Sequence, residues 1–418
     1  MKLTDEETAL LRGSRGRAVQ FAMEVLVKMG EIQGAQRMVP ITSAHVDGCA
    51  YEGDAVVDCV EFLARAGGKV AVPTTLNAIS IERGSWRRLN IPEAFGEKAG
   101  RIVDGYLQMG CRPTFTCSPY QMGCTPALGE HVAWAESNAI AYANSILGAR
   151  TDRYGDFLDI SAALAGRVPD VGLHRTENRR ARLVIHLGDD MDEAFRRHEA
   201  FYPLLGYWVG LQAGGRVPAI TGIPPDTSAD RLKALLAASA SSGAVALMHM
   251  VGLTPEAPSL DAALKGGQPD REVEVTRADL RATFEELDGG YREAVHAVVL
   301  GSPHFSTAEF RELALWARGR QKHESLRFLI TTNRTARDAA RTEGTLSTVE
   351  AFGAEVIADT CILLAPLLGR EVRTIMTNSG KYAHYSPGRL GVDVLFGSLK
   401  DCVETAVKGR LVREDVPW

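Results

Sequence analysis

The sequence lacks the features that mark several protein classes. Seven cysteines in 418 residues are too few for a disulfide scaffold, and an odd number leaves at least one unpaired. No C-x-x-C pair occurs, which excludes a zinc ribbon or a thioredoxin-type motif. No apolar run is long enough to span a bilayer. No basic run is long enough to suggest a dedicated nucleic-acid or anionic-membrane surface, and 47 Lys and Arg against 52 Asp and Glu give a net charge of −5.

The first residues do not have the pattern of a signal peptide. Asp5, Glu6 and Glu7 stand where a signal peptide carries positive charge followed by an apolar core. The composition, with 45% hydrophobic and 24% charged residues, is that of an ordinary globular protein. We therefore expect a cytoplasmic protein with two or three domains, or one large α/β unit.

Strand-like apolar runs alternate with helical patterns along most of the chain, which predicts an α/β fold with mostly parallel sheets flanked by helices. We expect two α/β regions, 1–180 and 181–418. Helices are expected at 17–30, 54–66, 92–109, 277–287, 307–318, 347–358 and 399–408. Strands are expected at 38–42, 69–73, 181–187, 217–222, 244–250, 294–302, 327–333, 372–378 and 392–398.

The stretch 110–153 is unusual because it combines thiols, a Pro-rich turn and polar residues set among alanines. Cys111, Cys117 and Cys124 surround the turn, and a helix is expected to follow. Alanines allow close backbone approach, and polar groups in such a crowded setting need hydrogen-bond partners. The stretch therefore predicts the wall of a site.

Several polar loops are expected directly after strands or helices. These are ITSAHVDGC, PTTLN, GSPHFS (301–306), TTNRT (331–335), ADTC (358–361) and TNSGKYAHYSPG (377–388). Turn chemistry explains any one of them equally well. Together they indicate one pocket at the carboxyl ends of the strands.

The motifs TCSPYQMG, GEHVAWAESNAIAYANSILGARTDR, GSPHFS, ADTC and TNSGKYAHYSPGRLG resemble the large catalytic component of aconitase X. The resemblance implies an aconitase-like iron–sulfur dehydratase, with a 2Fe–2S or 4Fe–4S cluster as Lewis acid. Activities known in the family are dehydration of cis-3-hydroxy-L-proline and of mevalonate 5-phosphate. Such chemistry also needs a base for the carbon-bound proton and groups that hold the carboxylate.

The resemblance also implies cluster ligands. Cys117 and Cys361 fall at positions associated with ligation. In the mevalonate-phosphate branch a cysteine is expected where this chain has Ser302, and because a hydroxyl binds iron less well than a thiolate, Cys49 is our substitute third ligand. Cys111 and Cys124 compete for that role, whereas Cys59 and Cys402 are expected to be packing residues.

The remaining predicted site residues belong to the same motifs. Catalytic candidates are Lys381, His384, Glu136 and His304. Substrate-binding candidates are His45, Thr74, Thr75, Asn77, Ser137, Asn138, Arg150, Ser302 and Ser379. Alternatives are a solvated Lys381, a Glu136 satisfied by its Asn and Ser neighbours, and an ion pair from Arg150 to Asp152 or Asp156.

The resemblance finally implies a partner. Aconitase-type proteins place the catalytic serine on a small swivelling domain with a Gly/Ser-rich loop, and no comparable segment is found here. We expect a separate small subunit, no nucleic-acid or membrane partner, and cis-3-hydroxy-L-proline as substrate. Mevalonate 5-phosphate dehydration and a non-catalytic cluster- or metabolite-binding regulatory protein are the alternatives.

Overall fold

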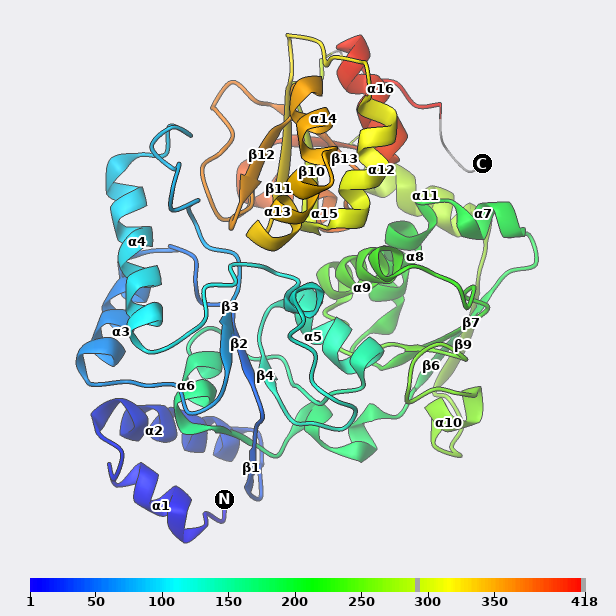
Figure 1. Ribbon diagram of the computed structural model, residues 1–418. Coiled ribbons are helices and arrows are strands. Elements are labelled where there is room, and N and C mark those ends of the chain that lie inside the picture. The colour runs from blue at the N-terminus through cyan, green and yellow to red at the C-terminus, as the bar shows by residue number, and fades with distance from the viewer. Residues whose placement is uncertain (290–293, 415–418) are drawn as a thin grey trace. The chain divides into compact units, whose positions relative to one another are not determined.

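The structure, a computed structural model, describes residues 1–289 and 294–414 (Figure 1). It divides into two compact units. Unit 1 is Met1–Arg180 with Thr254–Glu256, and unit 2 is Ala181–Leu253 with Ala257–Trp418. None of the helices in the described residues combines the length and the apolar character needed to cross a membrane.

Unit 1 is built on a small parallel sheet with strand order β3-β2-β4. A second, antiparallel pair joins β1 to β5. The strands are β1 (Met38–Pro40), β2 (Ala44–Val46), β3 (Thr74–Leu76), β4 (Ala133–Trp134) and β5 (Arg167–Pro169). The extended residues after Arg112 run beside β3, since Arg112 N–H donates to Thr74 O and Thr116 N–H to Leu76 O.

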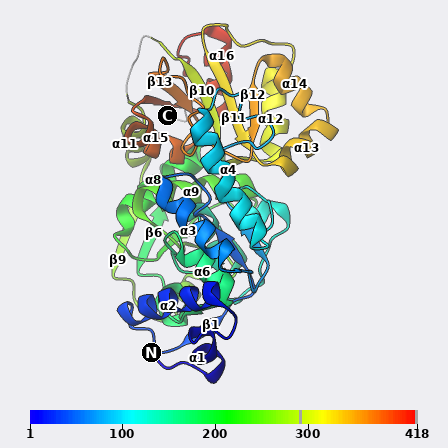
Figure 2. The same cartoon turned by 90° about the vertical axis from the view of Figure 1, so that its left-hand side faces the viewer.

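Helices surround this sheet. They are α1 (Asp5–Leu11), α2 (Arg17–Ile32), α3 (Asp54–Arg65), α4 (Glu93–Gln108), α5 (Ser137–Tyr142) and α6 (Leu158–Ala165), with short turns η1 (Pro119–Met122), η2 (Ala143–Leu147), η3 (Gly172–His174) and η4 (Thr176–Arg179). Thr4 and Glu7 form the capping box that begins α1. Helices α3 and α4 lie side by side (Figure 2), and their contact is close because a Cβ at Gly105 would stand 2.5 Å from Val60 Cγ1.

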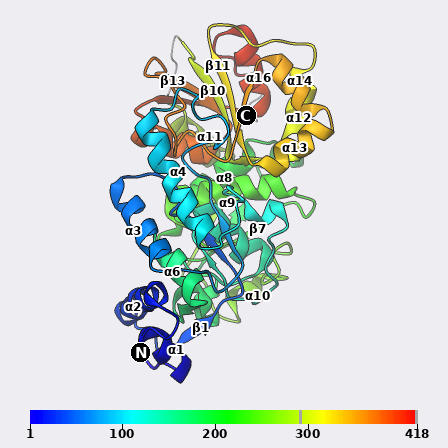
Figure 3. The same cartoon turned by 60° about the vertical axis from the view of Figure 1, so that its left-hand side comes forward.

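The main sheet of unit 2 has five parallel strands in the order β12-β11-β10-β13-β14. They are β10 (Ala297–Phe305), β11 (Arg327–Thr332), β12 (Glu355–Ala358), β13 (Thr374–Thr377) and β14 (Asp393–Phe396). Helices α12 (Thr307–Ala317), α13 (Arg334–Thr342) and α14 (Thr345–Phe352) lie beside it (Figure 3). Their apolar residues join the sheet and α16 (Leu399–Lys408) in one core, in which Phe328 meets Phe352 edge to face. Helices α11 (Arg277–Leu287) and α15 (Gly380–Leu390) also pack on this sheet.

A second parallel sheet of unit 2 has the strand order β8-β7-β6-β9. Its strands are β6 (Leu183–Leu187), β7 (Pro218–Thr221), β8 (His249–Met250) and β9 (Arg271–Val275). The accompanying helices are α7 (Glu193–Arg197), α8 (Phe201–Ala213), α9 (Ala229–Gly243) and α10 (Leu260–Leu264). Helices α8 and α9 approach very closely, because Gly206 and Gly243 face backbone of the partner helix where a Cβ would come within 2.1 Å of Leu235 O and 1.9 Å of Gly210 O.

Some predicted elements are wrong. Residues 69–73 form no strand, because the amides of Val70 and Ala71 donate to Met109 O and Ala163 O at helix ends. Helix α14 ends before Gly353, which has φ +102°, and β12 follows within the predicted helix. The expected helix of the 110–153 stretch is interrupted by β4 and shortened to α5 and η2.

Several predicted loops are also partly regular structure. Residues 301–305 extend β10, so Ser302 and His304 lie on a strand. In the segment 377–388, Ser379 caps α15, and Lys381 and His384 are helical. Thr74 and Thr75 likewise lie on β3.

Candidate active-site residues

The Cys117 loop of unit 1 is held in place by a buried amide. Asn138 is completely buried, and its Nδ2 donates to Cys117 O at 3.0 Å and to the Tyr120 hydroxyl at 2.9 Å. Tyr120 stacks on Tyr142 with ring centroids 3.6 Å apart. Burial raises the pKa of Tyr120 well above its usual value, so the hydroxyl is neutral. Asn138, predicted to bind substrate, therefore fixes the backbone that carries a predicted iron ligand.

Glu136 and Ser137 begin helix α5. Glu136 is buried and is the N-cap residue, since its Oε2 accepts from Ala139 N–H at 2.9 Å. The Ser137 hydroxyl donates to Glu136 Oε1 at 3.1 Å. A carboxylate at a helix N-terminus satisfies free amides and interacts favourably with the helix dipole. These contacts favour the alternative in which Glu136 is satisfied by its neighbours.

Cys49 lies in a closed environment. The thiol is completely buried and donates to Val46 O at 3.2 Å. Burial, and after it the carboxylates of Asp159 and Asp47, raise the pKa of Cys49 well above its usual value. Such surroundings favour a neutral packing thiol over a thiolate ligand.

Asp159 accepts hydrogen bonds from the backbone of the loop that carries Cys49. Its Oδ2 accepts from the amides of Asp47 at 2.7 Å and Gly48 at 3.4 Å. Burial raises the pKa of Asp159 to about 6. The carboxylate of Asp47 in turn accepts a hydrogen bond from Asn77 Nδ2. Asn77, which directly follows β3, therefore contacts the Cys49 loop. Sequence reasoning did not single out Asp159, which is the only acidic residue of the otherwise apolar α6.

His45 and Thr75 form a buried pair across β2 and β3. The distance from His45 Nδ1 to Thr75 Oγ1 is 2.8 Å. Burial lowers the pKa of His45 to about 3, so the imidazole is neutral at physiological pH. The Thr74 hydroxyl donates to Val72 O at 2.9 Å. The structure therefore brings His45 and Thr75 together, whereas the Thr74 hydroxyl bonds within its own segment of chain.

Arg150 is engaged by backbone and hydroxyl groups of unit 1. Its Nη1 donates to His174 O and Thr176 Oγ1, both at 2.8 Å. The ring of His174 lies between His131, whose Nδ1 is 2.8 Å from His174 Nδ1, and the hydroxyl of Tyr154. The predicted alternatives, ion pairs of Arg150 with Asp152 or Asp156, are not formed.

In unit 2, His304 connects two motifs that are distant in sequence. The ring is completely buried, and its Nε2 lies 3.1 Å from the carbonyl oxygen of Thr360, the residue before Cys361. Burial lowers the pKa of His304 to about 4, so the neutral ring donates Nε2–H to that carbonyl. Cys361 is partly exposed, and its carbonyl accepts from Leu364 and Ala365 in a turn after β12. His304 is thus placed to position the Cys361 segment.

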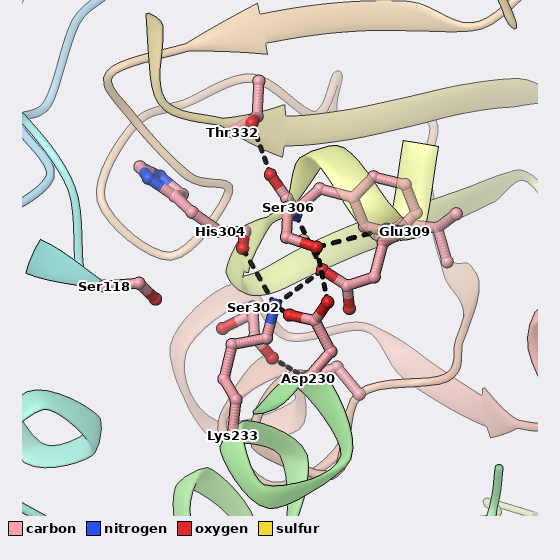
Figure 4. A network of polar contacts seen from close by, with 12 residues as sticks. Ser118, Asp230, Lys233, Ser302, His304, Ser306, Glu309 and Thr332 are labelled. Carbon is pink, nitrogen blue, oxygen red and sulfur yellow. Dashed lines mark hydrogen bonds and ion pairs between the residues drawn. The ribbon is translucent and has the colours of Figure 1, made fainter. Parts of the chain in front are cut away.

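A buried ion-pair network that the sequence analysis missed supports His304 (Figure 4). Lys233 Nζ donates to His304 O at 3.2 Å, to Glu309 Oε2 at 2.6 Å and to Asp230 Oδ1 at 2.9 Å. Ser306, the N-cap of α12, donates from Oγ to Asp230 Oδ2 at 2.6 Å. A lysine between Leu232 and Leu235 on the buried face of α9 was the available sequence signal.

The charges of this network are set by burial and by each other. Burial lowers the pKa of Lys233, but the carboxylates of Glu309 and Asp230 outweigh it and hold the pKa above its usual value. Burial raises the pKa of Glu309 to about 7, against the opposing effect of Lys233. Lys233 is therefore a cation at neutral pH. Of the two carboxylates beside it, the one whose negative charge burial disfavours is Glu309.

The remaining predicted residues of unit 2 gather at the start of α15. Ser379 is the N-cap, accepting from Tyr382 N–H at 3.1 Å and donating to Ser302 O. Lys381 and His384 are partly exposed and three residues apart, hence neighbours on one helix face. His384 Nδ1 lies 3.3 Å from the Tyr207 hydroxyl, and burial lowers the pKa of His384.

The seven cysteines differ in how well they fit as donors to an iron–sulfur cluster. No disulfide ties up any of the seven cysteines. Burial raises the pKa of five thiols, which favours their neutral form; these are Cys49, Cys59, Cys111, Cys124 and Cys402. Cys117 and Cys361 each lie in a loop held by a buried side chain, and they fit as thiolate donors. Cys117 belongs to unit 1 and Cys361 to unit 2. Across residues 1–289 and 294–414, no group of three His, Cys, Asp or Glu side chains is arranged to hold a metal ion.

The fold and motifs are those of an aconitase-type α/β protein, and the chain belongs to the aconitase X family. Its residues 1–177, 181–285 and 295–408 match the first, second and third domains of aconitase X. The crystal structure of Thermococcus kodakaraensis aconitase X in the holo-form superimposes with a TM-score of 0.87 at 35% identity, covering 97% of this chain and 100% of that one.

Two groups of dehydratases are similar to the chain. Cis-3-hydroxy-L-proline dehydratase of Pseudomonas aeruginosa is 45% identical over 97% of this chain and 70% of its own length. The enzyme of the same name from Hypocrea jecorina is 42% identical over 98% of this chain and 69% of its own length. The phosphomevalonate dehydratase large subunit of Methanosarcina mazei is 36% identical over 98% of both chains.

Proposed function

We propose that this chain is the large subunit of a hydro-lyase that removes water from cis-3-hydroxy-L-proline. The observation that carries the proposal is the 45% identity, over 97% of the chain, to a cis-3-hydroxy-L-proline dehydratase. Identity to the phosphomevalonate dehydratase large subunits is lower, at 32–39%. Ser302 in place of an expected cysteine agrees with this preference.

The cofactor of the proposed reaction is an iron–sulfur cluster held by the thiolates of Cys117 and Cys361. When bound, the cluster would supply the Lewis acid that assists departure of the hydroxyl group. Asn138 supports this role by fixing Cys117 O, and His304 supports it by fixing Thr360 O. Cys49 remains the predicted third ligand, and its closed environment is the argument against it.

Substrate binding is proposed for the start of α15. Lys381 would hold the substrate carboxylate through its ammonium group, with His384 beside it on the same helix face. Ser379 orients this turn because its hydroxyl both caps the helix and donates to Ser302 O. The base that takes the carbon-bound proton is proposed to be a serine of a separate small subunit, since several relatives are named as large subunits.

The test is an activity assay of the reconstituted enzyme. The chain is purified anaerobically together with the proposed small subunit, and dehydration of cis-3-hydroxy-L-proline and of mevalonate 5-phosphate is measured. We expect iron in the complex and turnover of the hydroxyproline. Turnover of mevalonate 5-phosphate alone would refute the substrate, and no iron and no turnover with either compound would refute the hydro-lyase.

Ligation is tested separately by iron content. Cys117→Ala and Cys361→Ala are expected to lose the cluster, measured by iron analysis and visible absorption. Cys59→Ala, on the partly exposed side of α3, is the matched control and keeps it. Equal iron in all three variants would show that the assignment is wrong, and loss of iron in Cys49→Ala would establish the third ligand.

Mevalonate 5-phosphate dehydration is the second candidate. It is favoured by the match to the M. mazei large subunit over 98% of both chains. A phosphate needs several cations around it. Among the predicted site residues, Arg150 is already engaged by His174 O and Thr176. Lys381 is the other cation among the predicted site residues, so few positive charges are predicted for a phosphate, which favours the smaller hydroxy acid.

A further inference from the structure

We propose that unit 2 carries a second binding site, for a small organic anion, at the amino ends of β13 and β14. A cavity of about 390 Å³ opens there, and three arginines line it. Arg370 and Arg373 come from the segment between β12 and β13, and Arg389 from the last turn of α15. Tertiary structure brings these guanidinium groups to one cavity, since Arg389 is distant in sequence from Arg370 and Arg373.

The charge around this cavity is unbalanced. No Asp or Glu is among the residues that line it. The carboxylate of Glu371 lies beside Gly369 of the lining, where a Cβ would come within 2.0 Å of Glu371 Oε1, and it offsets part of the positive charge of the three arginines. In the described part of the chain, no hydrogen bond or ion pair engages the side chain of Arg370 or Arg373. An anion placed beside the guanidinium groups of Arg370 and Arg373 offsets their mutual repulsion and accepts charge-assisted hydrogen bonds.

The rest of the lining is apolar, which narrows the ligand class. The apolar residues are Ile362, Ala365, Pro366, Leu368, Val372, Leu390 and Val392. An inorganic ion alone would leave this surface uncovered, whereas a phosphate ester or carboxylate with an apolar body matches both parts of the cavity. The expected ligand is therefore a small organic phosphate or carboxylate.

The cavity is distinct from the predicted substrate-binding residues at the start of α15. Arg373 directly precedes β13, while Ser379 and Lys381 follow the other end of that strand. A strand of four residues is about 13 Å long. The cavity therefore lies at the opposite edge of the sheet from the start of α15.

Occupation of the cavity has a consequence for the Cys361 segment. Ile362 lines the cavity and directly follows Cys361, so a bound anion would restrain the loop that carries a predicted cluster ligand. This consequence, unlike the binding itself, rests on the proposed function.

Binding is tested by isothermal titration of the full chain with inorganic phosphate and, separately, with citrate, at constant ionic strength set by chloride. The double variant R370Q/R373Q is compared with R318Q, which alters an exposed arginine at the end of α12. We expect saturable binding in the wild type and R318Q, and at least about tenfold weaker binding in the double variant, because each guanidinium contributes a charge-assisted contact.

The two anions identify the headgroup, because the tighter of phosphate and citrate shows whether phosphate or carboxylate is preferred. No saturable binding of either anion up to about 10 mM would overturn the proposal. Unchanged affinity in the double variant would overturn it as well. Urea unfolding without ligand checks that the double variant is folded, and R389Q serves in its place if it is not. None of these readouts depends on iron or turnover, so they fail or succeed independently of the proposed hydro-lyase.

Discussion

Replacing Lys233 with methionine is the sharpest test of how unit 2 positions His304. Lys233 is 1% exposed and joins Glu309, Asp230 and the carbonyl of His304. Methionine keeps much of the side-chain volume but removes the cation, which leaves the partly buried carboxylates of Asp230 and Glu309 without it. Removing one partner of a buried ion pair typically costs about 3–5 kcal/mol, because the remaining charge is uncompensated.

The expected loss can be read in a thermal or denaturant unfolding experiment. For a unit of this size, about 1 kcal/mol lowers the melting temperature by about 2–4 °C, so K233M should melt about 6–20 °C below the wild type. Lys408→Met, an exposed lysine at the end of α16, is the matched control and should change the free energy of unfolding by less than about 0.5 kcal/mol.

The pH dependence of the loss adds a second criterion. Burial raises the pKa of Glu309 to about 7 even with Lys233 present, and removal of the cation raises it further. The destabilisation of K233M should therefore be larger at pH 8, where the carboxyl is ionised in the unfolded chain but its ionisation is opposed in the folded variant, than at pH 5, where the folded carboxyl is protonated in both proteins. A second substitution, Glu309→Gln, should recover part of the loss at pH 8.

The opposite result would refute the reasoning. A loss below about 1 kcal/mol in K233M, or equal losses at pH 5 and pH 8, would mean that the network is hydrated rather than buried. A further check is the reconstituted enzyme, in which a displaced His304 should reduce iron retention more than Lys408→Met does.

Three further outcomes are expected. Burial, with His131 as the next cause, lowers the pKa of His174 to about 3 from an ordinary value of 6.5, so its contribution to stability is complete above pH 6.5 and is lost as the pH falls. His174→Gln should therefore show a shallower fall of the unfolding free energy between pH 6.5 and 4.5 than the wild type, measured in urea, and an equal or steeper fall would contradict this. Arg179 is completely buried and donates to Glu256, Asn144 and backbone carbonyls, so Arg179→Met should cost about 3–5 kcal/mol in the same assay, and a cost below about 1 kcal/mol would show that these contacts are replaceable. Gly210→Ala should cost about 1–3 kcal/mol because its Cβ would meet Ser239 O of α9 at 2.8 Å, and no loss would mean that α8 and α9 can move apart.

Helices with strong local signals could be predicted from the sequence. The predicted bounds of α11 and α16 agree with the structure at both ends. Each begins with a capping box, Thr276 with Asp279 and Ser398 with Asp401, and each carries a regular apolar face. These signals lie within a few residues of one another, so the local sequence is sufficient to specify them.

Elements that depend on distant partners could not be predicted in the same way. Strand β4 has two residues and exists because Ala133 and Trp134 pair with Ala44 and His45. The segment 69–73 has an apolar, strand-like pattern but finds its hydrogen-bond acceptors at helix ends. An apolar run in the sequence does not show which distant backbone groups will form hydrogen bonds with it.

The sequence by itself determined the α/β class, the aconitase X resemblance and the motifs that contain the predicted ligands Cys117 and Cys361. Tertiary structure decided what most of the other polar residues do. Asn138 holds Cys117 O, His304 holds Thr360 O, and Glu136 and Ser379 cap helices. The physical reason is that a hydrogen bond or a buried charge depends on which groups converge in space, and residues as far apart as 233 and 309 meet only after the chain has folded.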